Sequence, residues 1–393
     1  MYEEWSTLKK LIWFYAIKLK NKIKELIVTG VSPLSLPNAV ASHIKSLIQY
    51  GKSEQASAPT PTNPVDIYCN NGALKMLNLA NMTENNIVVG KYINNSGVPT
   101  NALSNFYYAP LIPVKSSATY TLKTSRSLNY SNFMEYDANK DFIKRTLYGS
   151  ADTPAGDMTT HTTDATTAYI RFGSNINGST LTAEAVLAIE WMLTEGNTAM
   201  DYVPYGQLST VGTPEVIIVS HADSTTETAG AEDLFAVGDY KDTQELIAGA
   251  VGHAVKAYAL TGDETVTSTM DGAGNTRFIV TIPNALSTTG RTACLSTHYV
   301  YASSGNVLNS IFLNYGKAVI TANGYTTAQI PEYKAFLAAQ YAAGTPVIVI
   351  YPLAEPTIET VTGQPLSTTA GTNIVSVTAE VSDIELEVIY KGE

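Results

Sequence analysis

Charged residues are scarce in this chain, and so are cysteine, histidine and tryptophan. Only 15% of the 393 residues are Asp, Glu, Lys or Arg, whereas 45% are hydrophobic. Intrinsic disorder requires the opposite balance, so we expect a folded protein, long enough for two or three domains. The 35 acidic residues outnumber the 24 basic ones. The resulting net charge of -11 repels a phosphate backbone, so nucleic acid is not an expected partner.

Two cysteines and five histidines supply little for a disulfide framework or a metal centre. Cys69 and Cys294 are expected to be small buried thiols. No two histidines stand at the i, i+4 spacing that presents two imidazoles to one metal. Residues 137–148 match the first three ligand positions of a calcium loop, but Phe142 and Tyr148 stand where that loop needs Gly and Glu. We therefore predict no metal site and no cofactor.

Motifs of catalysis are also missing. There is no Gly-x-Ser-x-Gly turn of the hydrolase type. The glycines of Met270–Thr276 lack the third member of a dinucleotide-binding loop and precede a β-rich run, so we predict an ordinary loop there. Glu190 and Glu195 are the best carboxylate candidates for glycosidic-bond cleavage, yet solvent-facing strand positions explain them more simply. We predict no catalytic residues and no enzyme activity.

A helical pattern opens the chain. Apolar side chains recur every three or four residues over 5–28, which predicts an amphipathic helix whose middle is apolar on all sides. Its apolar run is about a third of the roughly 20 residues that a membrane span needs, and its acidic start does not fit a secretory signal. We expect self-association or docking into a larger assembly, with membrane-surface binding and packing on its own domain as alternatives. The residues expected to make these contacts are Trp5, Leu8, Ile12, Trp13, Phe14, Leu19 and Ile23.

The next segments suggest the domain organisation. A second short helix is predicted between Pro37 and Gly51, and a Pro/Thr-rich linker follows over 56–64. Residues 1–55 therefore form a predicted helical attachment region. Beyond the linker, short β-branched and aromatic runs alternate with turn residues, a pattern typical of antiparallel sandwiches or barrels. We predict two such β-domains, over 65–206 and 207–393.

Within these domains several elements are clear from the pattern. Residues 133–143 predict a hairpin with its tip at 137–140, where Asn and Asp tolerate turn conformations. The apolar spacing over 328–343 predicts the single helix of the second domain, ended by Gly344. The almost wholly apolar run that follows, 346–351, predicts a central strand. The alternation at 384–388 predicts a strand with one buried face.

Tyrosine is abundant, with 24 residues, and many lie in the first β-domain. A saccharide presents apolar C–H faces together with hydroxyl groups, so an exposed aromatic ring beside polar residues suits it. Tyr107, Tyr108 and Trp191 are the best candidates for glycan contact, and core packing is the alternative for each.

Several segments of the sequence resemble those of a known group of proteins. They are 51–55 with the linker, Asn63–Lys75, Ile112–Thr121, Tyr136–Ile143, Ala168–Phe172, Glu195–Tyr205, Asp242–Glu245, Leu260–Glu264, Phe336–Val347 and Tyr351–Pro356. Together they resemble tail-fibre-like, receptor-binding minor structural proteins of gut bacteriophages and prophages, which carry carbohydrate-binding-module-like jelly rolls. Both β-domains are therefore expected to be jelly-roll-like sandwiches.

This resemblance implies a function in host attachment. It implies a structural protein on the surface of the phage particle, in a tail fibre, baseplate or head fibre, that binds a glycan or protein of the host surface. It further implies a homotrimer that docks onto other virion proteins through residues 1–55. Two rival interpretations remain: a virion-associated glycan depolymerase or esterase, and a purely structural capsid decoration or head fibre without a specific ligand.

Overall fold

The computed structural model describes most of the chain. The described residues are 25–29, 44–101, 105–150, 155–175, 181–212, 216–221, 224–230, 233–246, 249–360, 373–378 and 385–390. Strands dominate these ranges, and the two helices within them are α2 (Ala183–Leu187) and α3 (Ile330–Ala342). Every strand pair in them is antiparallel except β27 (Val300–Tyr301) with β28 (Ser310–Asn314). The predicted mostly β, antiparallel class is therefore confirmed.

The predicted N-terminal helical anchor is not supported. β1 (Glu25–Thr29) and β2 (Ile44–Tyr50) are strands, where the sequence predicts the end of one helix and most of a second. Both pair with β32 (Glu385–Tyr390), which lies between them. Pairing with a strand from the far end of the chain is a tertiary interaction, and it overrides a local helical period. The predicted docking residues Trp5, Leu8, Ile12, Trp13, Phe14, Leu19 and Ile23 lie outside the described residues.

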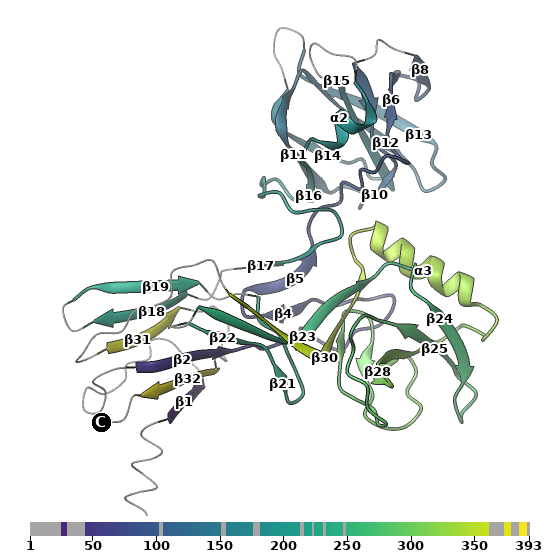
Figure 1. The fold of residues 1–393 in the computed structure, drawn as a ribbon. Helices are drawn as coiled ribbons and strands as arrows, with labels where there is room; N and C mark the ends of the chain where they lie inside the picture. The colour runs from purple at the N-terminus through teal and green to yellow at the C-terminus, as the bar shows by residue number, and fades with distance from the viewer. Residues whose placement is uncertain are drawn as a thin grey trace, which may run out of the picture.

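Residues 77–205 form a body of their own, which we call the middle body (Figure 1). Its larger sheet has the order β13-β12-β15-β9-β6 with β10 beside β15, and comprises β6 (Val88–Val89), β9 (Phe106–Tyr108), β10 (Ile112–Pro113), β12 (Tyr130–Tyr136), β13 (Phe142–Tyr148) and β15 (Tyr169–Asn175). Its smaller sheet has the order β14-β11-β16, and comprises β11 (Thr119–Leu128), β14 (Gly156–Thr162) and β16 (Trp191–Glu195). A two-stranded hairpin pairs β7 (Lys91–Ile93) with β8 (Pro99–Asn101). Phe133 and Phe172 from the larger sheet share one buried core with Tyr120 and Leu122 from the smaller.

The hairpin predicted over 133–143 is confirmed as β12 and β13. One carboxylate oxygen of Asp137 accepts hydrogen bonds from the backbone N–H groups of Asn139 (2.8 Å) and Asp141 (2.9 Å). Lys140 has a φ of 67°, in the left-handed region that such a turn requires. The residues that partly match a calcium loop therefore build a turn.

The remaining described segments form the terminal body, which contains two large sheets. The first has the order β1-β32-β2-β22-β23-β30-β26, with β22 (Thr243–Glu245), β23 (Ala250–Leu260), β26 (Leu295–Ser296) and β30 (Val347–Thr360). The second has the order β24-β25-β29-β28-β27, with β24 (Val266–Met270), β25 (Thr276–Thr281) and β29 (Lys317–Thr321). The residues between β24 and β25 turn the chain, so the loop predicted at Met270–Thr276 is confirmed in place of a nucleotide-binding helix.

Smaller sheets complete the terminal body. The order β17-β5-β4-β3 contains β3 (Glu54–Gln55), β4 (Ile67–Cys69), β5 (Gly72–Met76) and β17 (Leu208–Val211). The order β19-β18-β31 contains β18 (Val216–His221), β19 (Thr226–Gly230) and β31 (Asn373–Thr378). A last pair joins β20 (Ala236–Val237) to β21 (Tyr240–Lys241).

The apolar run predicted to be a central strand forms the start of β30, and both of its faces are buried. Val347, Val349 and Tyr351 point into the core that β30 shares with α3 and the five-stranded sheet. Ile348 and Ile350 point into a second core, formed with β4 and β5. Because side chains alternate along a strand, an uninterrupted apolar run is what a strand between two cores requires.

Residues 54–76 belong to the terminal body, whereas the sequence pattern divides them among attachment region, linker and first β-domain. The backbone N–H of Val65 donates to the carbonyl of Thr297 (2.9 Å). Ile67 and Leu74 are buried in the core under β30. The chain therefore contacts the rest of the terminal body directly after the Pro/Thr-rich segment.

The helix predicted over 328–343 is confirmed as α3. Tyr333 and Leu337 bury one of its faces, and the ring of Tyr333 stacks on Phe278 with centroids 4.0 Å apart. Gly344 follows the helix with a φ of 76°, a conformation that other residues adopt only with strain. The helix thus ends where the sequence predicts.

Candidate functional site

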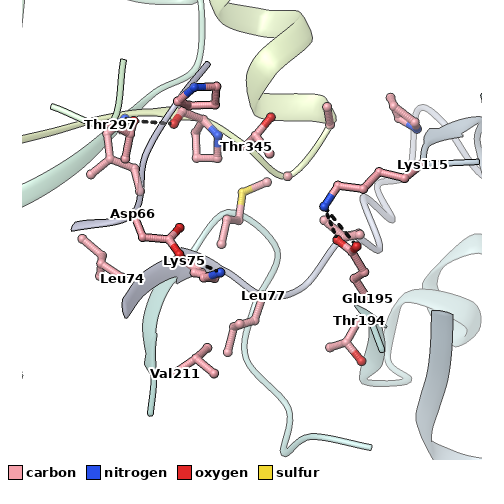
Figure 2. Close-up of a pocket in the computed structure, with 18 of the residues that line it drawn as sticks. Asp66, Leu74, Lys75, Leu77, Lys115, Thr194, Glu195, Val211, Thr297 and Thr345 are labelled. Carbon is pink, nitrogen blue, oxygen red and sulfur yellow. Dashed lines mark hydrogen bonds and ion pairs between the residues drawn. The ribbon is translucent and has the colours of Figure 1, made fainter. Parts of the chain in front are cut away.

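A pocket of about 660 Å³ lies where the middle body meets the terminal body, and we call it the interbody pocket (Figure 2). The chain crosses between the bodies twice, after β5 and before β17. Leu77, at the first crossing, and Val211, at the far end of β17, both line the pocket. The middle body contributes Lys115, Thr194 and Glu195. The site therefore exists only when the two bodies are docked.

Two ion pairs stand on opposite walls of this pocket. Lys75 Nζ lies 3.2 Å from a carboxylate oxygen of Asp66, on the terminal body. Lys115 Nζ lies 2.8 and 3.0 Å from the two carboxylate oxygens of Glu195, on the middle body (Figure 2). All four side chains are about half exposed, so these pairs contribute little to stability and keep hydrogen-bonding capacity for a ligand. Their charges cancel, so the polar walls are neutral overall.

The remaining lining is mainly apolar. Leu74, Leu77 and Val211 lie together near the Asp66–Lys75 pair in Figure 2. Thr297 closes the wall opposite Val211; its hydroxyl donates to the carbonyl of Pro346 (3.1 Å) and accepts from the N–H of Ile348 (2.9 Å). An apolar floor beneath polar walls suits an amphipathic ligand with hydroxyl groups on one side.

Asn78 anchors the first chain crossing within the middle body. Its side-chain amide nitrogen donates to the carbonyls of Trp191 (2.7 Å) and Val203 (2.8 Å). Its amide oxygen accepts from the backbone N–H groups of Ala80 (2.9 Å) and Leu193 (3.2 Å). A buried amide with four partners ties the first chain crossing to β16 and to the return segment.

Burial changes the pKa of His298, which also lines the pocket. His298 is fully buried, and its Nδ1 lies 2.8 Å from the hydroxyl of Thr297. Burial lowers the pKa of His298 to about 4. The imidazole is therefore neutral at neutral pH and adds no charge to the site.

The three predicted glycan-binding residues do not line the interbody pocket. Tyr107 and Trp191, 1% and 3% exposed, pack against each other in the middle-body core with centroids 5.2 Å apart. The indole N–H of Trp191 donates to the carbonyl of Val186 (2.8 Å). Tyr108, 7% exposed, lies on the opposite face of the larger sheet. Core packing, the alternative named from sequence, describes Tyr107 and Trp191.

The carboxylates considered for glycoside cleavage are too far apart to cooperate. Glu190 and Glu195 are separated by five residues along an extended segment, roughly 16 Å, beyond the range at which two carboxylates flank one bond. Glu195 is instead engaged by Lys115. Sequence reasoning noticed Glu195 but missed its partner, because the two residues are brought together only by the fold.

A buried polar cluster lies elsewhere in the middle body. His161 contacts Glu135 through Nε2 and Tyr148 through Nδ1, each at 3.0 Å. An ionised carboxylate can only accept, so Nε2 of His161 donates to Glu135. Glu135 also accepts from the hydroxyl of Thr167 and from the N–H of Asp164 (2.6 Å). Burial raises the pKa of Glu135, but these hydrogen bonds outweigh it and lower that pKa to about 2.

Other reactive groups are buried or dispersed. Cys69 and Cys294 are buried, as predicted, and burial raises the pKa of the Cys294 thiol far above its usual range. Within the described ranges, His, Cys, Asp and Glu residues form no group of three or more arranged to hold a metal ion. In the same ranges no helix is long and apolar enough for a membrane span.

Comparison of the chain with protein families, with curated proteins and with solved structures finds no match in any of the three.

Proposed function

We propose that this chain is a structural protein of a bacteriophage particle, of the fibre or receptor-binding class, and that it attaches to glycans of the host surface. In this proposal the middle body and the terminal body act as jelly-roll-like sandwiches on the particle surface. The proposal is supported by the mostly antiparallel β fold and by the phrases that resemble phage fibre proteins. It places the protein in a tail fibre, baseplate or head fibre.

The residues that line the interbody pocket support a saccharide as the proposed ligand. Its volume of about 660 Å³ is in the usual range for small-molecule sites. Ion pairs with cancelling charges supply donors and acceptors on its walls, and leucine, valine and methionine side chains supply an apolar floor. An uncharged saccharide unit matches both features. We propose this pocket, in place of the buried Tyr107 and Trp191, as the contact site for host glycan.

Weak single sites are sufficient for attachment when many act together. We propose a homotrimer that docks on other virion proteins through residues 1–55. Linked sites raise the effective concentration, so avidity exceeds the affinity of one pocket by about two to four orders of magnitude. No chemistry on the glycan is required for this function.

Filling the pocket tests the site. Val211 lines it and is 37% exposed, so Val211→Trp places an indole into the cavity. Val307, 43% exposed and outside the pocket, gives the matched control Val307→Trp. On an array of bacterial surface polysaccharides, we expect Val211→Trp to weaken binding of the full-length protein at least tenfold and Val307→Trp to leave it unchanged. Equal binding by the two variants would contradict the pocket assignment.

Two further measurements separate the rival functions. Incubation of the protein with host capsule should leave its viscosity unchanged, and a progressive loss of viscosity would favour a depolymerase. Antibodies against the protein should label the surface of purified phage particles in electron microscopy. A labelled particle whose protein binds no polysaccharide would favour a purely structural decoration.

A further inference from the structure

An arginine on the larger sheet of the middle body is held between two tyrosine rings. Along β15, Ile170 and Phe172 point into the core, so Arg171 projects from the opposite face. Its guanidinium carbon lies 5.2 Å from the ring centroid of Tyr108 on β9 and 5.5 Å from that of Tyr136 on β12. Both tyrosines are diagonal neighbours across adjacent strands, which is the distance at which long side chains meet.

A glycine next to Arg171 on the same face of the sheet makes room for this arrangement. Gly173 follows Arg171 on the same face of β15 and pairs with Tyr108. A Cβ atom at position 173 would lie 2.8 Å from the carbonyl oxygen of Tyr107 and 3.2 Å from Cβ of Tyr108. Any larger residue there would push Tyr108 away, so the glycine permits the ring to lie beside the guanidinium.

The hydrogen-bonding groups of Arg171 are left unused. Nε is fully buried and has no hydrogen-bond partner among the described residues. It packs between the two rings, and no ion pair joins it to a carboxylate in the described part of the chain. Arg291 shows the contrast, because it stacks on Phe312 but donates to two backbone carbonyls. The rest of the Arg171 guanidinium therefore keeps its hydrogen-bonding capacity for a ligand.

The surroundings favour an anion with a planar pair of oxygens. Arg171 is half-buried, so the rest of its guanidinium can reach solvent beside the rings. Lys140 adds a second positive charge, 5.7 Å above the ring of Tyr169, which pairs across the sheet with Tyr136. A guanidinium fixed by two rings binds a carboxylate through two parallel hydrogen bonds, and an apolar surround strengthens them.

We propose that Arg171, clamped by Tyr108 and Tyr136, is a second ligand site that recognises the carboxylate of an acidic saccharide. The saccharide part of this inference rests on the proposed attachment function, whereas carboxylate recognition rests on the clamp alone. The site differs from the interbody pocket, whose paired charges favour an uncharged sugar. One protein would then contact neutral and acidic units of a host glycan on separate surfaces.

Arginine side-chain NMR tests the proposal directly. The full-length protein with ¹⁵N-labelled arginine is titrated with sodium glucuronate, with methyl glucopyranoside and with sodium acetate, and Arg171→Lys identifies the Nε resonance of Arg171. We expect a saturable shift of that resonance with glucuronate, none with the neutral glucoside, and at least fivefold weaker binding of acetate. An unshifted resonance, or equal binding of glucoside or acetate, would overturn the proposal.

Matched variants separate a planar clamp from simple charge attraction. By ligand-observed NMR, Arg171→Lys should bind glucuronate at least fivefold more weakly although it keeps the charge. Arg126→Lys, on an exposed arginine of the same body, should bind it normally. Gly173→Ala keeps Arg171 but displaces Tyr108, and it should weaken binding as well. Normal glucuronate binding by both Arg171→Lys and Gly173→Ala would also overturn the proposal.

The two proposals can fail separately. If glucuronate leaves the Arg171 resonance unshifted while Val211→Trp still weakens array binding at least tenfold, the acidic site is wrong and attachment through the interbody pocket stands. If glucuronate binds at Arg171 but the protein neither binds polysaccharide on the array nor labels phage particles, the carboxylate site stands and the attachment function is wrong.

Discussion

At the scale of single residues, buried hydrogen bonds set the chemistry of this protein more than exposed charges do. Glu135 is the clearest case, because its side chain is fully buried and still ionised. His161, Thr167 and the backbone of Asp164 hold it by hydrogen bonds, and Lys144 Nζ lies 3.3 Å away. These contacts join β12, β13 and β14, so the carboxylate links the two sheets of the middle body.

Glu135→Gln should therefore remove an acid-sensitive contribution to stability. The pKa falls from 4.5 to about 2 on folding, which corresponds to about 3 kcal/mol. A lowered carboxyl pKa stabilises the fold above pH 4.5, and this contribution is lost as pH falls toward 2. In urea unfolding between pH 7 and pH 2.5, we expect Glu135→Gln to be less stable at pH 7 and to depend less on pH. The exposed Glu84→Gln should follow the wild-type curve, and a parallel curve for Glu135→Gln would contradict this.

At the scale of elements, the long strand β23 contains an irregularity stabilised by a buried carboxylate. Its register with β30 shifts between His253 and Val255. One oxygen of Asp242 accepts from the N–H groups of Ala254 (2.7 Å) and Val255 (2.9 Å). The bulged backbone groups thus keep partners that the neighbouring strand cannot supply. His253 lies beside this point, 3.2 Å from Glu359 on β30.

His253 should make the protein sensitive to alkali. Asp242 raises the pKa of His253, burial opposes this, and Glu359 adds to the increase, giving a pKa of about 9. A raised histidine pKa stabilises the fold below pH 6.5, and the contribution is lost as pH rises through about 9. We expect the wild-type free energy of unfolding to decrease between pH 7 and pH 9.5 by roughly 2 kcal/mol more than that of His253→Gln. Identical pH profiles for the two proteins would refute this.

At the scale of the whole molecule, close contacts through glycine bring the two bodies together. A Cβ atom at Gly344, just after α3, would overlap Cδ2 of Leu79 at the start of the middle body. A Cβ atom at Gly206 would overlap the hydroxyl of Tyr341 on α3. The ring of Tyr341 also meets that of Tyr205 edge to face, with centroids 5.7 Å apart. Of these residues, Gly344 and Leu79 line the interbody pocket.

Gly344→Ala should therefore displace the Leu79 side chain, which lines the pocket, and weaken glycan binding. Gly324 offers a matched control, because its φ of 80° is close to the 76° of Gly344 but nothing lies within 4 Å of its Cβ position. Both alanine variants should lose about 1 kcal/mol of stability from backbone strain. Only Gly344→Ala should also lose binding on the polysaccharide array, by about tenfold. Equal binding by the two variants would show that this contact does not shape the pocket.

Sequence patterns predicted those elements whose cause is local. The hairpin at 133–143 follows from turn residues, α3 follows from apolar spacing and a terminal glycine, and the central strand at the start of β30 follows from an uninterrupted apolar run. The segments 25–29 and 44–50 were predicted wrongly, because their pairing with β32 is set by residues more than 300 positions away. No local periodicity records such a partner.

For the candidate sites too, the sequence reveals residue types but not the contacts that the fold creates. Tyr107, Tyr108 and Trp191 could be picked out by residue type, but type does not reveal which side of a sheet a ring occupies or what covers it. Two of them are core residues, and Tyr108 gains its proposed role only from Arg171 beside it. The Lys115–Glu195 pair joins residues 80 positions apart, and no motif marks either one.

The sequence alone determined that this protein folds into antiparallel sheets, that its cysteines are buried, and where its turns and its main helix fall, because composition and short-range spacing govern those properties. Only the tertiary structure decided which charges face one another, which aromatic rings are covered, and that a pocket opens between two bodies. Those features depend on contacts between residues far apart in the chain, and such contacts produce no periodic pattern in the local sequence.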